Sequence, residues 1–201
     1  MGDGGRSCEV PWITEKLKGV EGKVICDFGC ETGKETYGVD LEKNEYRQYD
    51  LNPAHDGIIQ ANLITGAGMP DRESVDTGIC VSVVEHLGLD CYNQKTSLYG
   101  DLVALGSMLR RIKTGGILYV TVPFSVPGYF VRHWIKSYSP LEIQLWQHLI
   151  VGRHDASIDF ETFKKSGLRW IPCYDAKEFF DLKHYGVGED IIGIACITIQ
   201  K

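Results

Sequence analysis

The chain has 201 residues and a formal net charge of −6 at pH 7, with 43% hydrophobic and 24% charged residues. This composition is typical of a globular domain with one core, and the acidic balance disfavours nucleic-acid partners, which usually bind a basic face. No apolar run approaches the roughly 20 residues that cross a bilayer, and the first residues lack a signal-peptide core. We therefore expect a cytoplasmic protein without membrane insertion.

The first part of the chain is predicted to form one helix and three strands. Residues 1–9 are rich in glycine and predict a flexible tail, and residues 10–18 carry apolar side chains at helical spacing. We expect this helix to cover a short crossover between a first strand at 23–28 and a second at 36–41. A third strand is predicted at 57–61.

The loop after the first predicted strand contains the motif Asp27-x-Gly29-x-x-x-Gly33. A glycine turn after a strand lets the backbone approach a ligand, because glycine has no Cβ and tolerates positive φ. Asp40 ends the second predicted strand, where a carboxylate would accept hydrogen bonds from a ribose. A dinucleotide fingerprint would read G-x-G-x-x-G, with its acid about 20 residues further on. The observed spacing therefore disfavours an NAD-dependent oxidoreductase.

The rest of the chain continues the alternation of strands and helices. A continuous apolar run at 78–84 predicts a strand covered on both faces. A helix at 97–112 ends at a Gly-Gly turn, and a fifth strand follows at 117–122. A further helix is predicted at 140–150. Residues 170–174 and 191–199 are predicted to form an antiparallel pair that closes a seven-stranded sheet.

With these elements, residues 23–124 resemble the class I S-adenosylmethionine (SAM)-dependent methyltransferases, whose first motif is D-x-G-x-G-x-G. Glu31 stands where that family has its middle glycine. The predicted crossover is shorter than the dozen residues usually needed, as in a branch of predicted small-molecule and glycan methyltransferases. The resemblance implies an α/β fold: a Rossmann-like three-layer sandwich with a mixed seven-stranded sheet whose last strand is antiparallel.

The resemblance also predicts the organisation of the chain. We expect a single methyltransferase domain over residues 1–201. Its parts would be a tail and cover helix at 1–22, a cofactor-binding core at 23–124, a variable acceptor or lid segment at 125–168, and closing strands at 169–201.

The cofactor implied by the resemblance is SAM, bound at the carboxyl ends of the strands. The residues expected to bind it are Asp27, Gly29, Cys30, Gly33, Asp40, Leu41, Asn62, Leu63 and Ser82. Asn62 is expected to bond the adenine amino group, and Asp50 competes with it for that role.

His86 follows the fourth predicted strand and is the candidate general base. A structural role that ties the strand to a neighbouring loop fits His86 equally well. Some RNA methyltransferases of this fold hold a metal on an E-x-x-E-H set at this point, but Ser82 occupies its first position here. We therefore predict no metal. The seven cysteines form no C-x-x-C pair and predict free thiols.

The implied reaction is methyl transfer. We expect O-methylation of a small molecule, sugar or lipid-linked acceptor, with no nucleic-acid substrate, and residues 125–168 selecting that acceptor. Candidate residues to line the acceptor pocket there are His133, His148 and His154, and Trp134 and Trp146 are candidates for a lid. The alternative is a SAM- or nucleotide-binding module without catalysis. The sequence leaves the acceptor and the oligomeric state open.

Overall fold

The computed structural model describes residues 5–126, 130–132, 135–175, 179 and 193–201. Its centre is a mixed eight-stranded sheet in the order β3-β2-β1-β4-β5-β10-β8-β9. The strands are β1 (Val24–Phe28), β2 (Glu45–Asp50), β3 (Ile59–Gln60), β4 (Val75–Val81), β5 (Ile112–Pro123), β8 (Ser157–Ser166), β9 (Arg169–Pro172) and β10 (Gly193–Gln200). Strands β1 to β5 are parallel, and β10 is antiparallel to both of its neighbours.

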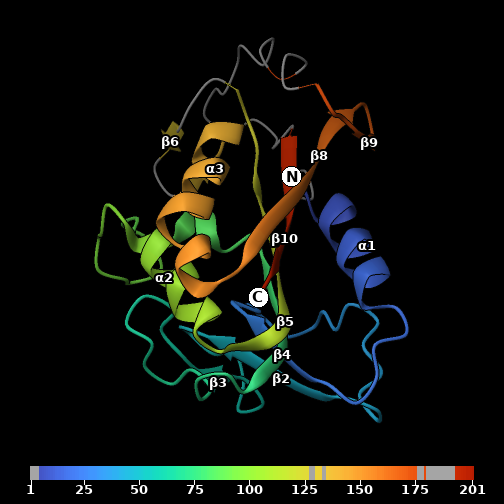
Figure 1. Cartoon of the computed structure of the whole chain (residues 1–201), viewed down its shortest axis with the longest axis vertical. Helices are drawn as coiled ribbons and strands as arrows, with labels where there is room; N and C mark the ends of the chain where they lie inside the picture. Colours follow the sequence, from blue (N-terminus) through green and yellow to red (C-terminus); the bar gives the residue numbers. More distant parts are fainter. Residues whose placement is uncertain (1–4, 127–129, 133–134, 176–178, 180–192) are drawn as a thin grey trace.

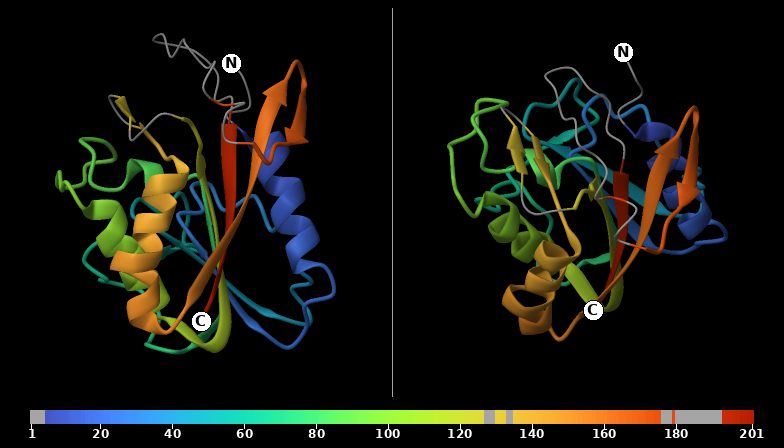
Figure 2. Two further views of the ribbon diagram at one scale, coloured as in Figure 1. Left: turned by 45° about the horizontal axis from the view of Figure 1, so that its top comes forward. Right: turned by 90° about the horizontal axis from the view of Figure 1, so that it is seen from above.

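Helices cover both faces of this sheet (Figures 1 and 2). Helix α1 (Arg6–Leu17) lies on one face, and α2 (Gly100–Leu109) and α3 (Pro140–Leu149) lie on the other. Two 3₁₀ turns, η1 (Val84–His86) and η2 (Val151–His154), and a separate ribbon of β6 (Phe130–Arg132) and β7 (Ile135–Ser137) complete the described chain. The expected α/β three-layer fold with a mixed sheet is confirmed, with eight strands in this sheet in place of seven.

The central strands form because their side chains are apolar toward both helical layers. Along β1, Ile25 packs with α1 whereas Cys26 packs with α2, and Ile79 and Cys80 alternate in the same way along β4. All four side chains are fully buried. The parallel pairing of β1 with β4, with Asp27 opposite Ile79, places the carboxyl ends of these two strands side by side.

The predicted second strand at 36–41 is wrong. Tyr37 and Gly38 have φ values of 51° and 71°, in the left-handed region that a strand cannot contain. The strand that pairs with β1 is β2, which begins at Glu45 and ends at Asp50. Residues 29–44, all of them described, form turns without a helix.

The predicted closing pair is also wrong in its partners. Strand β10 pairs with β5 and β8, and β9 pairs with β8 alone. Strand β8, at residues 157–166, falls in the segment that was expected to select the acceptor. Residues 191 and 192 of the predicted last strand lie outside the described residues.

Helix α1 begins at Arg6, inside the stretch predicted as a flexible tail. Its apolar face buries Trp12, Ile13 and Leu17 against the sheet and against Tyr37 of the β1–β2 crossover. Burying each such side chain contributes about 1.5–3 kcal/mol relative to an exposed one. The helix therefore covers the crossover, as expected. This packing also fixes the first turn of α1 near the carboxyl ends of the strands.

Candidate functional site

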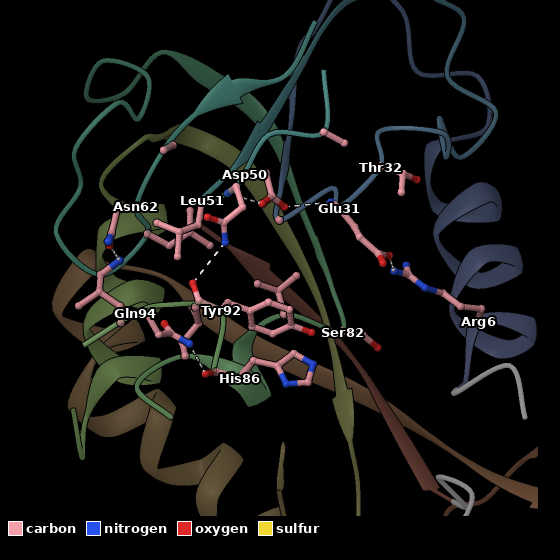
Figure 3. A pocket seen from close by; sticks show the side chains of 18 residues that line it. Arg6, Glu31, Thr32, Asp50, Leu51, Asn62, Ser82, His86, Tyr92 and Gln94 are labelled. Carbon is pink, nitrogen blue, oxygen red and sulfur yellow. Dashed lines mark hydrogen bonds and ion pairs between the residues drawn. The ribbon is translucent and has the colours of Figure 1, made fainter. Parts of the chain in front are cut away.

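A cavity of about 350 Å³ opens at the carboxyl ends of β1 to β4 (Figure 3). Small-molecule sites usually have this size, and open α/β sheets bind ligands at this edge. The cavity lies between the loops that follow these strands, the first turn of α1 and the segment before α2. Its lining residues are Arg6, Gly29, Glu31, Thr32, Asp50, Leu51, Asn52, Ala54, Ala61, Asn62, Leu63, Ile64, Ser82, Val83, His86, Leu87, Tyr92 and Gln94.

Gly29 brings the loop after β1 against the end of β4. Its φ is 85°, and a Cβ at this position would lie 2.4 Å from a methyl carbon of Val83. A larger residue would therefore push the two loops apart. Gly33, with φ 66°, lies further along the same loop, where a Cβ would approach the Gln48 side chain at 2.9 Å. The first glycine lines the cavity, and the second shapes the loop without lining it.

Asp50 ends β2 and faces the cavity (Figure 3). One carboxylate oxygen accepts the Glu31 backbone N–H at 2.9 Å, and the other accepts that of Asn52 at 2.8 Å. A carboxylate offers about four lone-pair sites, so acceptor capacity remains for a ligand. Asp50 thus couples the β1 and β2 loops at the position where the sequence had predicted the acid of the second strand.

Asp40 and Leu41, both predicted to bind the cofactor, lie outside the cavity. Asp40 is in a turn, where its carboxylate accepts the Glu42 backbone N–H at 3.1 Å and lies 3.9 Å from the Lys43 ammonium. Leu41 is 56% exposed. Their assignment followed from the wrong second strand.

Asn62 and Leu63, both predicted to bind the cofactor, follow β3 and line the cavity. The side-chain oxygen of Asn62 accepts the backbone N–H groups of Ile64 and Thr65 at 3.0 and 2.9 Å. This oxygen therefore stabilises a turn, and it is the amide NH₂ of Asn62 that remains for a ligand. The neighbouring Leu51, Leu63 and Ile64 give this end of the cavity an apolar lining.

Ser82 joins the end of β4 to α1. Its hydroxyl donates to a carboxylate oxygen of Glu9 at 2.5 Å, and the Thr121 hydroxyl donates to the same oxygen at 2.7 Å. Ser82 has φ 52°. A non-glycine residue in this conformation costs about 1–2 kcal/mol. Glu31 and Tyr92 also have positive φ, so three of the seven such described residues line the cavity. Backbone strain of this kind gathers at functional sites.

His86 ends η1 and lines the cavity. Its ring packs edge-on against Tyr92, with centroids 5.5 Å apart, and its backbone oxygen accepts the Gln94 amide at 2.6 Å. The Nε2 atom lies 4.0 Å from Glu85 Oε1, too far for a hydrogen bond. The segment from Tyr92 to Gln94 therefore fixes both the ring and the backbone of His86.

Buried acids surround the floor of the site. Burial raises the pKa of Asp27 to about 7, although the Tyr46 hydroxyl, which donates to it at 3.1 Å, and the Arg6 charge oppose the rise. Burial, with the nearby Glu9, raises the pKa of Glu85 well above its usual range. Neither Glu85 carboxylate oxygen has a hydrogen-bond partner among the described residues. Burial therefore favours the protonated, neutral form of the Glu85 carboxyl group.

A buried ion pair supports η1 from behind. The Lys136 ammonium donates to the backbone oxygen of Leu87 at 3.0 Å and lies 3.5 Å from a carboxylate oxygen of Asp101. The Tyr138 hydroxyl donates to the same Asp101 oxygen at 3.0 Å. Because Leu87 follows His86 directly, this network holds the cavity wall in place.

The structure brings five of the ten predicted site residues to the cavity: Gly29, Asn62, Leu63, Ser82 and His86. Asp27 is buried beneath it, and Cys30, whose pKa burial raises to about 12, lies beside it without lining it. Arg6 and Tyr92 were missed, since the first fell in the predicted tail and the second has no motif. Trp146 is 2% exposed and packs on Tyr138 in the core.

His148 and His154 do not line this cavity, and His133 and Trp134 lie outside the described residues. Within the part of the chain that the structure describes, no group of three His, Cys, Asp or Glu side chains could hold a metal ion. Nor does any described helix combine the length and apolar character needed to span a membrane.

The fold is shared with methyltransferases of known structure. A Burkholderia thailandensis 1,6-didemethyltoxoflavin-N1-methyltransferase, with 1,6-didemethyltoxoflavin and S-adenosylhomocysteine bound, superposes with a TM-score of 0.64 at 10% identity, over 99% of this chain and 79% of that one. A Methanosarcina mazei SAM-dependent methyltransferase gives 0.59 at 12% identity, over 90% and 93%. The [4+2]-cyclase SpnF gives 0.63 at 13% identity, over 96% and 79%.

No protein-family profile and no curated protein matches the sequence. At 10–13% identity the likeness to these structures establishes the fold. The chain therefore has the fold of the class I SAM-dependent methyltransferases, and SpnF shows that the same fold also serves a cyclase.

Proposed function

We propose that the protein binds SAM in this cavity and transfers its methyl group to an oxygen atom of a small molecule, sugar or lipid-linked acceptor. The observation that carries the proposal is the position of Asp50. It ends the second strand of the sheet beside a glycine turn and faces the cavity. From such a position a carboxylate accepts hydrogen bonds from a ribose diol.

The rest of the cavity supports the same ligand. Leu51, Leu63 and Ile64 form an apolar end that suits a flat adenine ring, with the Asn62 amide at its edge. At the other end, Arg6 and Glu31 form an ion pair at 3.8 Å beside the glycine turn (Figure 3). These polar groups would face the amino-acid part of the cofactor.

Bound SAM would supply an electrophilic methyl group on a positively charged sulfur. An acceptor oxygen held in line with the carbon–sulfur bond would take this methyl group, and the electron pair of that bond would stay on sulfur. The acceptor must also lose its proton, and His86, which lines the cavity, would take it. Such proton removal contributes about 10²–10⁴-fold in rate, and alignment by the cavity walls contributes more.

Calorimetry with SAM, S-adenosylhomocysteine and NAD tests the binding half of the proposal. We expect both sulfur compounds to bind and NAD not to bind. Tight binding of NAD alone would overturn the assignment. Methyl transfer is then measured as release of S-adenosylhomocysteine across sugars, phenols, small acids and lipid-linked acceptors.

His86→Ala separates the two roles open to this histidine. For a general base we expect kcat to fall by about 10²–10⁴-fold with SAM affinity nearly unchanged, and the acid limb of the pH–rate profile to be lost. His148→Ala, an exposed change on α3 outside the cavity, is the matched control. Unchanged turnover in His86→Ala would remove the general base. SAM binding without turnover on any acceptor would favour the binding module.

A further inference from the structure

The outer part of the β8–β9 hairpin carries exposed apolar side chains beside cations that are exposed, as Arg169 is, or half-buried, as Lys164 and Lys165 are. Leu168, at the turn, is 98% exposed, Ile171 is 43% exposed and Tyr174 is 88% exposed. Residues 162–174 contain the cations Lys164, Lys165 and Arg169 and no aspartate or glutamate, in a chain whose formal net charge is −6. The outer part of the hairpin, residues 162–174, is thus a locally cationic, amphiphilic surface on an acidic protein.

The hairpin stands on a rigid base. Strand β8 pairs with β10 from Ser157, opposite Gln200, to Lys164, opposite Gly193. On the α1 side, the Trp12 indole N–H donates to Glu161 at 3.0 Å, and that of Trp170 donates to Ser7 at 2.9 Å. The tip is therefore held in a defined place, as Figures 1 and 2 show at the end of β8 and β9.

The tip lies at the end of the sheet where the parallel strands have their carboxyl ends. The cavity opens at this same end of the sheet. Gly193 pairs with Lys164 and its backbone oxygen accepts the N–H of Phe124, which follows β5. The end of β8 is thus level with the carboxyl end of β5, and residues 166–169 project beyond it. A surface that receives the hairpin tip would also face the cavity edge of the molecule.

Edge protection explains part of this pattern. Strand β9 is the last strand of the sheet, and edge strands often carry lysine, which opposes pairing with another chain. That role accounts for Arg169, the cation on β9, but not for Lys164 and Lys165, which lie on β8. It does not account for Leu168, which reaches into solvent from the turn, where no strand pairing occurs.

We propose that the β8–β9 hairpin docks the protein on an anionic lipid bilayer. Cations next to exposed Leu, Ile and Tyr side chains are the pattern by which proteins lie in a membrane interface. Leu168 and Ile171 enter the acyl boundary, while Lys164, Lys165 and Arg169 meet the headgroups. A nucleic acid fits less well, because binding single strands usually requires aromatic faces on which bases stack. The Lys165 ammonium lies over one face of the Trp170 ring, 5.9 Å from its centroid, and this face is not open to a base.

This docking goes beyond the proposed function, since binding to a membrane requires no methyl transfer. It also narrows that function. A protein held with its cavity edge toward the bilayer would meet acceptors that are lipid-linked or lie in the headgroup layer, one of the acceptor classes proposed above.

Sedimentation with vesicles tests the docking directly. The wild type should bind phosphatidylcholine vesicles that contain phosphatidylglycerol, less at high salt, and should bind pure phosphatidylcholine weakly. Replacing Lys164, Lys165 and Arg169 with glutamine should lower the partition coefficient roughly 100-fold, from three cations at an anionic surface. Leu168→Ser should lower it by about tenfold or more.

Two controls match these variants. Replacing Lys18, Lys23 and Arg72 with glutamine changes the net charge equally at exposed positions away from the cavity edge, and Leu141→Ser removes another exposed leucine, on α3. Both should bind within about threefold of the wild type. Thermal melts should show all four variants folded, because every changed side chain is at least partly exposed.

The docking would be overturned if the wild type did not bind vesicles, or if the hairpin and control variants lost vesicle binding equally. Competition by soluble glycerol phosphate would also overturn it, because it would indicate a free phosphate site. Salt-sensitive RNA binding that requires Lys164, Lys165 and Arg169, without vesicle binding, would replace the membrane by a nucleic acid. Methyl transfer to water-soluble acceptors alone would leave the docking intact but would exclude the lipid-linked acceptor.

Discussion

The buried carboxyl group of Asp27 should make the protein less stable as the pH rises toward neutrality. Its pKa in the folded state is about 7, against 3.8 for an unperturbed aspartate. Below about pH 4 the group is protonated in both the folded and the unfolded chain. Between pH 4 and 7 the unfolded chain has released the proton while the folded chain still holds it, so the free energy of unfolding falls with rising pH.

The size of this effect follows from the two pKa values. They differ by about 3 pH units, and each unit corresponds to about 1.36 kcal/mol. Asp27 should therefore remove about 4 kcal/mol of stability between pH 4 and pH 7. Above about pH 7 both states are ionised, and the contribution becomes constant.

Asp27→Asn isolates this contribution because an amide is neutral throughout the range. Urea unfolding at pH 4, 5, 6, 7 and 8 should show the difference in free energy of unfolding, variant minus wild type, rising by about 4 kcal/mol up to pH 7. Other buried acids, Glu85 among them, titrate equally in both proteins and cancel. Asp56→Asn, at an exposed position, should keep the pH dependence of the wild type. A difference that stays constant within about 1 kcal/mol would refute the reasoning.

Three further predictions concern the site and its support. Asp50→Ala should weaken SAM binding by about 1.5–3 kcal/mol in calorimetry, whereas Asp40→Ala should leave the affinity within a few-fold. A larger loss of affinity in Asp40→Ala than in Asp50→Ala would show that Asp40 is the acid that binds the ribose. Lys136→Met should lower the free energy of unfolding by about 3–5 kcal/mol, because it leaves the Asp101 carboxylate buried without its cation. An unchanged urea midpoint would contradict this. Glu31→Gly should raise stability by about 1 kcal/mol, since glycine adopts φ 55° without strain. A hundredfold gain in SAM affinity would instead show that the Glu31 side chain obstructs the cavity.

The central strands could be predicted from the sequence because they are apolar on both faces. Val24 to Cys26 and the run around Ile79 have no other stable place than a sheet between two layers. The helix at 140–150 was also predictable, since Pro140 stands at its first turn and Glu142 accepts the Ser139 backbone N–H at 2.9 Å. These patterns involve residues close together in the sequence, so they determine the local structure without depending on contacts made elsewhere in the fold.

Strand β2 could not be recognised in the same way. It reads Glu-Tyr-Arg-Gln-Tyr-Asp, and of its six side chains only that of Tyr49 is fully buried. Its strand conformation comes from pairing with β1, which is a long-range interaction. The segment at Tyr37 has the more strand-like composition, yet its glycine and its left-handed backbone form a turn. The ribose-binding acid was therefore predicted at Asp40, whereas the acid that ends β2 and lines the cavity is Asp50.

Strand β8 did carry a signal that was missed. Ile158, Phe160 and Thr162 alternate with Asp159 and Glu161, which is the period-two pattern of a half-buried strand. The contribution of Arg6 to the cavity, in contrast, has no sequence signal, because it depends on how α1 docks across the sheet.

The packing of α1 on β8, β9 and β10 also bears on how the chain folds during synthesis. The hydrogen bond from Trp170 to Ser7 joins residues 163 positions apart, and the bond from Trp12 to Glu161 spans 149 positions. Helix α1 leaves the ribosome long before the strands it packs against. Until they arrive, its Trp12, Ile13 and Leu17 side chains have only part of their cover, and such exposed apolar faces promote aggregation. Folding is therefore expected to be slow and completed late, because contacts of this sequence separation form only after the intervening chain has been ordered.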